Sequence, residues 1–306
     1  MAGLADRRTK GNHAADQTEL GPAGDPLIPG EPSRTALAAA THRAAHQLLE
    51  DGRIFADPLA LRILNAEPDA VLATASAEPA RSPIRLFIAC RHRVAEDRVA
   101  EAVAGGLRQV VILGAGLDTG AYRSPHGSEV TWFEVDHPAT QAWKQRRLRE
   151  TGIEVPRFLR YVSIDFETEI LGERLAAAGF DEAAPSIFIW LGVVPYLTEA
   201  AIFGTLAFIA GLPGGGEVVF DYADPPVNWP TELRPMMDAR AARVAAVGEA
   251  WISFFEPAPL AERLRALGFS EIEDCLSGPI VAGYMPEANV ADRTRGGHII
   301  WARATS

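Results

Sequence analysis

The sequence contains little of what a membrane-spanning, secreted or disulfide-linked protein requires. Only two cysteines, Cys90 and Cys275, occur among 306 residues, and they form no C-x-x-C or metal-ligand spacing. Such sparse use of cysteine is typical of a reducing compartment. No apolar run approaches the roughly 18 residues needed to span a bilayer, and the N-terminus lacks the apolar core of a signal peptide. We therefore expect a cytoplasmic protein with no membrane partner.

Positive charge is also scarce. The chain has 29 Lys and Arg against 40 Asp and Glu, and this formal net charge of -11 disfavours nucleic acid as a partner. The basic run at residues 144–149, KQRRLR, is more typical of a solvated helix face than of a phosphate-binding track. His42 and His46 stand four residues apart, but no third ligand accompanies them, so no metal site is expected.

Apolar residues are abundant enough for one large domain, because they make up 48% of the chain. Residues 1–32 mix charge with Gly and Pro and show no periodicity, which predicts a disordered tail. A single domain is expected over residues 33–306. Within it, residues 33–105 have a helical pattern that begins with Ser33 as a cap, and residues 223–255, rich in Pro, Trp and Met, predict a lid or substrate-binding insertion.

The most informative stretch is residues 109–123, QVVILGAGLDTGAYR. The apolar residues before its first glycine are typical of a central parallel strand that is buried on both faces. Gly114 and Gly116, on either side of Ala115, let the backbone turn sharply and approach a ligand, because neither has a Cβ atom. The dinucleotide motif G-x-G-x-x-G would need glycine where Thr119 stands. The stretch therefore predicts a strand that ends in a cofactor-binding turn.

Strands and helices alternate after this turn at a spacing typical of a parallel sheet. The next strands are expected near residues 130–135, 158–164, 186–191 and 217–222. Two last strands, near residues 270–276 and 298–302, have no predicted helix between them and should pair antiparallel. The pattern predicts an α/β fold.

Acidic residues stand at the ends of two of these strands, where open parallel sheets bind their ligands. Asp136 ends the second strand about 20 residues after the glycine turn, where an acid can bind ribose hydroxyls. It is better placed than Glu134, although a helix N-cap before Pro138 is an alternative role. Asp165 and Phe166 follow the third strand, where they could contact an adenine ring or simply form a turn beside the core.

Together these motifs resemble the leucine carboxyl methyltransferase family, and most closely its bacterial branch of S-adenosylmethionine-dependent enzymes, which includes natural-product methyltransferases. QVVILGAGLDTGAYR, FEVDHP, YVSIDF and WLGVVPYLT carry the resemblance, supported by TALAAATHRAA, FADPLA and SFFEP. The match extends from about residue 33 to the C-terminus. It implies a Rossmann-like class I methyltransferase fold: a mostly parallel, seven-stranded sheet with an antiparallel last strand and a helical N-terminal extension.

The resemblance also implies which residues bind the cofactor, S-adenosyl-L-methionine. These are Arg91 at its carboxylate, Gly114, Ala115 and Gly116 along its methionine part, Asp136 at its ribose, and Asp165 with Phe166 at its adenine. From the residues alone, Arg91 is one of several arginines in its helix, and a solvated helix face is an equally good interpretation.

Two positions depart from the family pattern. Leu191 stands where relatives carry an acidic residue after the fourth strand, which leaves a contact to the cofactor's ammonium group to a backbone carbonyl or removes it. Gly120 stands where many relatives have arginine, and glycine would weaken the start of a following helix by about 1 kcal/mol.

The predicted function is O-methylation of a carboxylate or hydroxyl on a small natural-product acceptor. A carboxylate is already ionised at neutral pH, whereas a phenol would need a general base, and no catalytic residue is assigned. Tyr196, Tyr222 and Trp229 could line the acceptor pocket or belong to the core. The alternatives are a nicotinamide-dependent oxidoreductase, which Thr119 disfavours, and a catalytically inactive cofactor-binding protein, which Leu191 favours.

Overall fold

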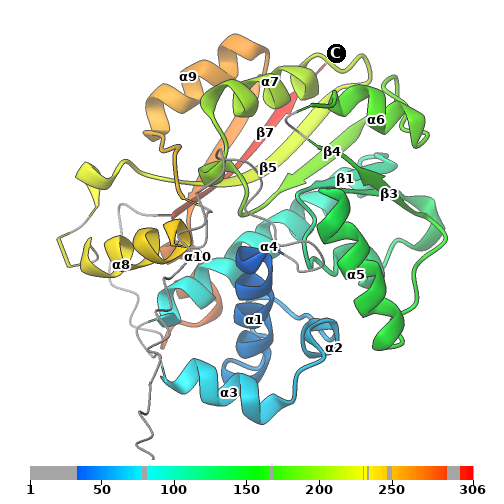
Figure 1. Ribbon diagram of the computed structural model, residues 1–306. Coiled ribbons are helices and arrows are strands. Elements are labelled where there is room, and N and C mark those ends of the chain that lie inside the picture. The colour runs from blue at the N-terminus through cyan, green and yellow to red at the C-terminus, as the bar shows by residue number, and fades with distance from the viewer. Residues whose placement is uncertain are drawn as a thin grey trace, which may run out of the picture.

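The computed structural model describes residues 33–77, 81–165, 168–229, 231–232, 234–246, 250–287 and 297–305. Their centre is a seven-stranded sheet in the order β3-β2-β1-β4-β5-β7-β6, with helices on both faces (Figure 1). The strands are β1 (Gln109–Leu113), β2 (Thr131–Asp136), β3 (Leu159–Ser163), β4 (Ser186–Trp190), β5 (Gly216–Ala223), β6 (Glu271–Leu276) and β7 (Gly297–Ala304).

The pairing of the strands confirms the predicted fold class. β1 pairs in parallel with β2 and β4, β2 with β3, and β4 with β5. β7 runs antiparallel to both β5 and β6. One expectation was wrong: the helix α10 (Ser277–Tyr284) lies between β6 and β7. Its sequence, SGPIVAGY, is too short to show helical periodicity, and it forms because it can bury Val281 against the core beside α4 (Ser82–Ala104).

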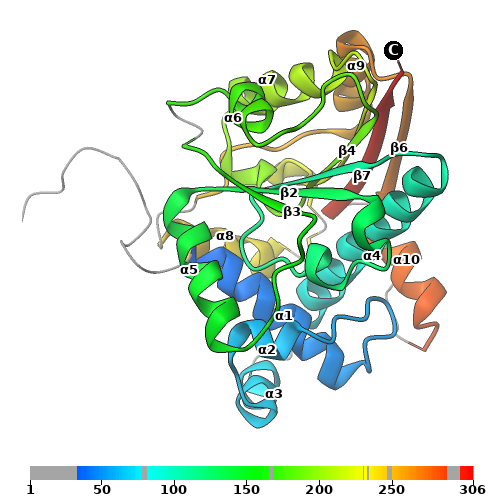
Figure 2. The ribbon, with the colours of Figure 1, turned by 90° about the vertical axis from the view of Figure 1, so that its right-hand side faces the viewer.

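Successive side chains of a strand point to opposite faces of the sheet, so the core has two layers, one on each face. In β1, Val111 and Leu113 point into one layer, and Val110 and Ile112 point into the other. The helices α6 (Leu171–Ala177), α7 (Glu199–Ala210) and α9 (Pro257–Leu267) cover the first layer, and α4 and α10 cover the second. Figures 1 and 2 show these helices above and below the sheet.

Helices also make up the described chain before β1. The Ser33 hydroxyl accepts a hydrogen bond from the Ala36 N–H, as predicted, and begins α1 (Arg34–Leu49). α1 packs against α2 (Ala60–Leu64), α3 (Pro68–Ala77) and α4. The predicted tail at residues 1–32 lies outside the described residues.

No α-helix follows the glycine turn directly. Two short 3₁₀ turns, Gly120–Arg123 and Gly127–Glu129, take its place before β2, and α5 (Pro138–Glu150) is the first α-helix after them. The Gly120 N–H donates to the Asp118 carboxylate at 2.6 Å, so this side chain caps the tight turn. Gly120 therefore serves in a turn, and the helix-propensity cost expected for it does not apply.

Candidate functional site

The ends of the first three strands are joined at the carboxyl edge of the sheet. The Ala115 N–H donates to the Val135 carbonyl at 3.1 Å, and the Gly116 N–H donates to the Asp136 carboxylate at 2.5 Å. The Ile164 N–H donates to the Asp136 carbonyl at 3.0 Å, which places Asp165, just after β3, beside the tip of β2. The structure therefore brings the glycine turn, Asp136 and Asp165 to one edge, whereas Phe166 lies outside the described residues.

Asp136 holds the glycine turn and is not the helix cap. Its second carboxylate oxygen accepts the His137 N–H at 2.7 Å, and His137 itself caps α5 by accepting the Ala139 N–H at 3.2 Å. Burial raises the pKa of Asp136, and the two backbone N–H groups oppose that rise. The residue is half-buried, and each of its oxygens keeps a lone pair for a further donor.

The two glycines of the turn are required by the packing of the chain itself. Both have positive φ, +65° at Gly114 and +46° at Gly116. A Cβ atom at Gly114 would lie 2.5 Å from Val193 Cγ2, and one at Gly116 would lie 3.0 Å from the Ala36 Cβ atom. Ala115 between them is buried. The turn is thus held between the segment after β4 and the start of α1.

Arg91 of α4 lies at the ends of β4 and β5. Its Nη1 donates to the Asp221 carboxylate of β5 at 3.1 Å, and both side chains are buried. Gly192, directly after β4, has φ +72°, and a Cβ atom there would lie 2.8 Å from the Arg91 guanidinium. Leu191 is half-buried against the core layer that contains Val110 and Ile112 of β1. Arg91 is therefore not a solvated surface residue; it reaches the strand ends.

A buried polar cluster behind the turn was missed in the sequence. The Asp57 carboxylate accepts the Thr119 hydroxyl at 2.8 Å and Arg43 Nε at 3.2 Å. Arg43 also donates to the Leu117 carbonyl at 2.5 Å. This cluster explains why threonine and not glycine occupies position 119. The signal for it was Arg43, an arginine in the alanine-rich start of the helical region.

Asp118 and His92 extend this cluster. His92 Nδ1 lies 3.4 Å from the Asp118 carboxylate, and its ring stacks on Phe55 at 5.0 Å. Burial, with the charge of Arg43, holds the pKa of His92 well below its usual value. Burial would raise the pKa of Asp118, but neighbouring His92 and Arg43 outweigh it and bring that pKa to about 2.

Glu134, the second acid considered for the ribose, is paired inside the protein. It is buried and lies 2.8 Å from Lys144 Nζ and 3.1 Å from the Tyr122 hydroxyl. Burial raises the pKa of Glu134 to about 7, although Lys144 opposes the rise. Lys144, the first residue of the basic run, is thus a core residue and not part of a solvated face.

Known proteins resemble this chain over the residues that form this edge of the sheet. The model of the family described as leucine carboxyl methyltransferase matches residues 36–210, which include the glycine turn, Asp136 and Arg91. That is more than half of the chain. The chain belongs to the leucine carboxyl methyltransferase family.

Three relatives of this chain have names that describe them as proposed S-adenosyl-L-methionine-dependent methyltransferases. YktD of Bacillus subtilis is 35% identical over 49% of this chain and 50% of its own length. A protein of Mycolicibacterium paratuberculosis is 39% identical over 45% of each chain. A third, from Saccharopolyspora erythraea, is 32% identical over 60% of this chain and 64% of its own length. The alignments with the first two span about half the length of those relatives.

Two of the three aromatic residues predicted for the acceptor side are buried in this family member. The Tyr222 hydroxyl donates to the Asp274 carboxylate, and Trp229 Nε1 donates to the Asp224 carbonyl at 2.8 Å. Both side chains belong to the core in this structure. They are buried, and each has its polar group satisfied by a partner inside the protein. Tyr196 is half-buried after β4.

The predicted insertion at residues 223–255 packs beside the segment that follows β4. It contains the helix α8 (Arg234–Ala245). The N–H groups of Ile252 and Ser253 donate to the Pro195 carbonyl at 2.8 and 3.2 Å. Val227 and Ile252 are exposed by 78% and 55%, which is unusual for large apolar side chains. Whether the segment acts as a lid stays a prediction.

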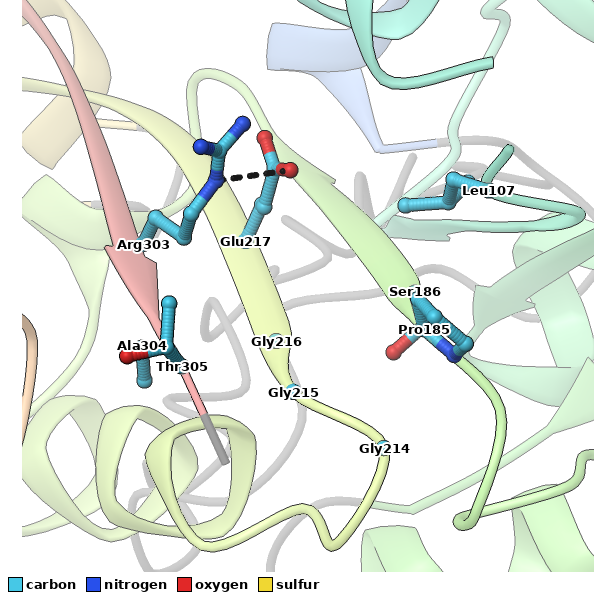
Figure 3. Close-up of a pocket in the computed structure, with 10 residues that line it drawn as sticks. All are labelled: Leu107, Pro185, Ser186, Gly214, Gly215, Gly216, Glu217, Arg303, Ala304 and Thr305. Atoms are coloured by element: carbon cyan, nitrogen blue, oxygen red, sulfur yellow. Dashed lines mark hydrogen bonds and ion pairs between the residues drawn. The ribbon is translucent and has the colours of Figure 1, made fainter. Parts of the chain in front are cut away.

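A surface hollow lies at the opposite edge of the sheet. It has a volume of about 180 Å³ and lies beside the amino ends of β4 and β5, and Figure 3 shows Ser186, the glycines at 214–216 and the Glu217–Arg303 ion pair around it. Parallel sheets bind ligands at their carboxyl edge, so this hollow is not the predicted cofactor site. Within the described part of the chain, no group of three or more His, Cys, Asp or Glu residues could hold a metal ion. None of the helices in these described residues is long and apolar enough to cross a membrane.

Proposed function

We propose that this protein is an S-adenosylmethionine-dependent methyltransferase. The single observation that carries the proposal is the position of Asp136, which holds the glycine turn of β1 by one oxygen and stays half-exposed at the tip of β2. An acid at this place can accept both hydroxyls of a ribose. Family membership and the names of the relatives support the same activity.

The residues at the strand ends fit such a cofactor. Asp136 has lone pairs for the ribose, and Asp165 lies one residue beyond the β2–β3 contact, where it can accept from the adenine amino group. Arg91 has a buried Nε with no partner in the described part of the chain, which is a donor suited to a carboxylate. When bound, S-adenosylmethionine supplies an electrophilic methyl group. The protein's part is then to hold the acceptor in line and to exclude water.

The finer proposal is that the acceptor is a small molecule with a carboxylate or hydroxyl group. Support comes from Val227 and Ile252, exposed apolar residues on the insertion beside the segment after β4, with Tyr196 half-buried in that segment. These side chains suit a partly apolar acceptor. A methyl ester formed on a carboxylate is released by mild base, whereas a methyl ether is not. Base treatment of radiolabelled product therefore distinguishes the two, and label fixed on carbon or nitrogen would contradict O-methylation.

Calorimetric titration with S-adenosylhomocysteine tests the cofactor site. The wild-type protein should bind it, and Asp136→Ala should bind at least about tenfold more weakly, because hydrogen bonds to a charged group are lost. The matched control is Asp69→Ala, which removes the same charge from the exposed first turn of α3 and should leave affinity unchanged. Thermal unfolding should show both variants folded. Absence of binding to the wild-type protein at millimolar ligand would rule out the proposed function.

A further inference from the structure

A buried ion pair joins α4 to the ends of β4 and β5. Asp221 interrupts the apolar run of β5, and its exposed fraction is 3%, while that of Arg91 is 5%. A buried charge pair costs desolvation energy that its mutual attraction only partly offsets. Stability is therefore a weak explanation for the pair, and its geometry suggests another role.

Asp221 fixes two neighbouring groups with its two oxygens. Oδ1 accepts the Gly192 N–H at 2.5 Å, and Oδ2 accepts Arg91 Nη1 at 3.1 Å. Gly192 has φ +72° and no room for a Cβ atom, because the guanidinium fills that place at 2.8 Å. A single carboxylate thus sets the backbone after β4 and the orientation of Arg91 together.

The contact with Asp221 does not satisfy every donor of the guanidinium. A guanidinium can offer two parallel N–H groups to a carboxylate, either from Nη1 and Nη2 or from Nε and Nη2. Asp221 takes Nη1, so the Nε–Nη2 side remains. Nε is buried and has no hydrogen-bond partner in the described part of the chain. An unpaired buried donor is costly, which indicates that a ligand completes it.

We propose that Asp221 is a positioning residue for the cofactor site: by holding Nη1 and the Gly192 N–H, it turns the Nε–Nη2 side of Arg91 toward the carboxylate of the cofactor's methionine part. The inference rests on the proposed function. It also bears on the absence of an acid at Leu191. The carboxylate that holds the end of β4 here belongs to Asp221 on the neighbouring strand β5.

The test compares two ligands that differ only in the carboxylate, S-adenosylhomocysteine and its decarboxylated analogue. Wild-type protein should bind the first about tenfold to hundredfold more tightly, as expected for a charge-assisted bidentate contact. In Asp221→Asn that ratio should fall at least about fivefold, with little change in affinity for the analogue. The matched control is Glu217→Gln, which breaks an ion pair with Arg303 at the other end of β5 and should keep the wild-type ratio.

The outcomes separate this inference from the proposed function. An unchanged ratio in Asp221→Asn, or equal weakening of both ligands, would show that Asp221 is only structural and would overturn the inference. Failure of the wild-type protein to bind either ligand would overturn the proposed function itself. If Asp221→Asn does not fold, Asp221→Glu is the second variant, because it keeps the charge but moves it by one methylene group. The ratio of the two affinities should fall there as well.

Discussion

Glycine is used in this protein for two separable reasons, conformation and space. Gly114 and Gly179 both have positive φ, +65° and +89°. At Gly114 a Cβ atom would clash with Val193, whereas at Gly179, after α6, nothing lies within 4 Å of that place. The two positions therefore share the strain of a left-handed backbone and differ in packing.

This difference yields a prediction at the residue scale. Gly179→Ala should lower the free energy of unfolding by about 1 kcal/mol, the cost of the left-handed conformation for an L-residue. Gly114→Ala should cost about 1–3 kcal/mol more, because overpacking is added to the same strain. Urea unfolding of both variants provides the measurement. Equal losses at the two positions would show that Val193 does not constrain the turn.

The N-terminal helices and the sheet are joined by charged side chains as well as by apolar packing. Asp57, between α1 and α2, is fully buried and binds both Arg43 of α1 and Thr119 of the loop after β1. Arg123, at the end of the 3₁₀ turn, lies 3.6 Å from the same carboxylate. The helical portion thereby holds the loop that carries the glycine turn.

At this scale we expect Asp57→Ala to be strongly destabilising. The change leaves the buried Arg43 without its counter-ion, which typically costs 3–5 kcal/mol, so we expect a loss of about that size in the free energy of unfolding. The exposed pair Arg263–Glu199, at 2.7 Å, is the control, and Glu199→Ala should cost about 1 kcal/mol or less. Denaturant unfolding of both variants tests this. A loss below about 1 kcal/mol for Asp57→Ala would contradict the role of the cluster.

A single histidine, His298, connects the three strands at one end of the sheet, β5, β7 and β6. His298 of β7 lies between Asp274 of β6, at 2.9 Å, and Asp224 directly after β5, at 3.4 Å, and it stacks on Tyr222 at 4.7 Å. Burial would lower the pKa of His298, but the two carboxylates outweigh it and raise the pKa above its usual 6.5.

The stability of the whole molecule should therefore depend on pH through this residue. Because the folded-state pKa exceeds the unfolded-state value, the protonated imidazole stabilises the fold fully below about pH 6.5, and this contribution is lost as pH rises through the folded-state pKa. The difference in unfolding free energy between wild type and His298→Gln should shrink from pH 6 toward higher pH. Urea unfolding of both proteins at a series of pH values provides the measurement. A constant difference across this range would contradict the assignment.

Much of the fold and part of the site could be predicted from local sequence. Apolar runs ended by turn residues placed the strands within a few residues, since a buried parallel strand requires such a run. The glycine turn and Asp136 were found because a strand end fixes where the next side chain lies. α10 was missed because its short apolar sequence has no period that distinguishes a helix from a loop.

What the sequence determined by itself was the order of the strands along the chain, the glycine turn after the first of them and the family resemblance, because these depend on neighbouring residues and on spacing. Only the tertiary structure decided which charged residues are buried together. Arg43 with Asp57 and Arg91 with Asp221 come from elements far apart in the chain. An ion pair of this kind has no local signature, because its energy depends on the distance and burial that the fold alone creates.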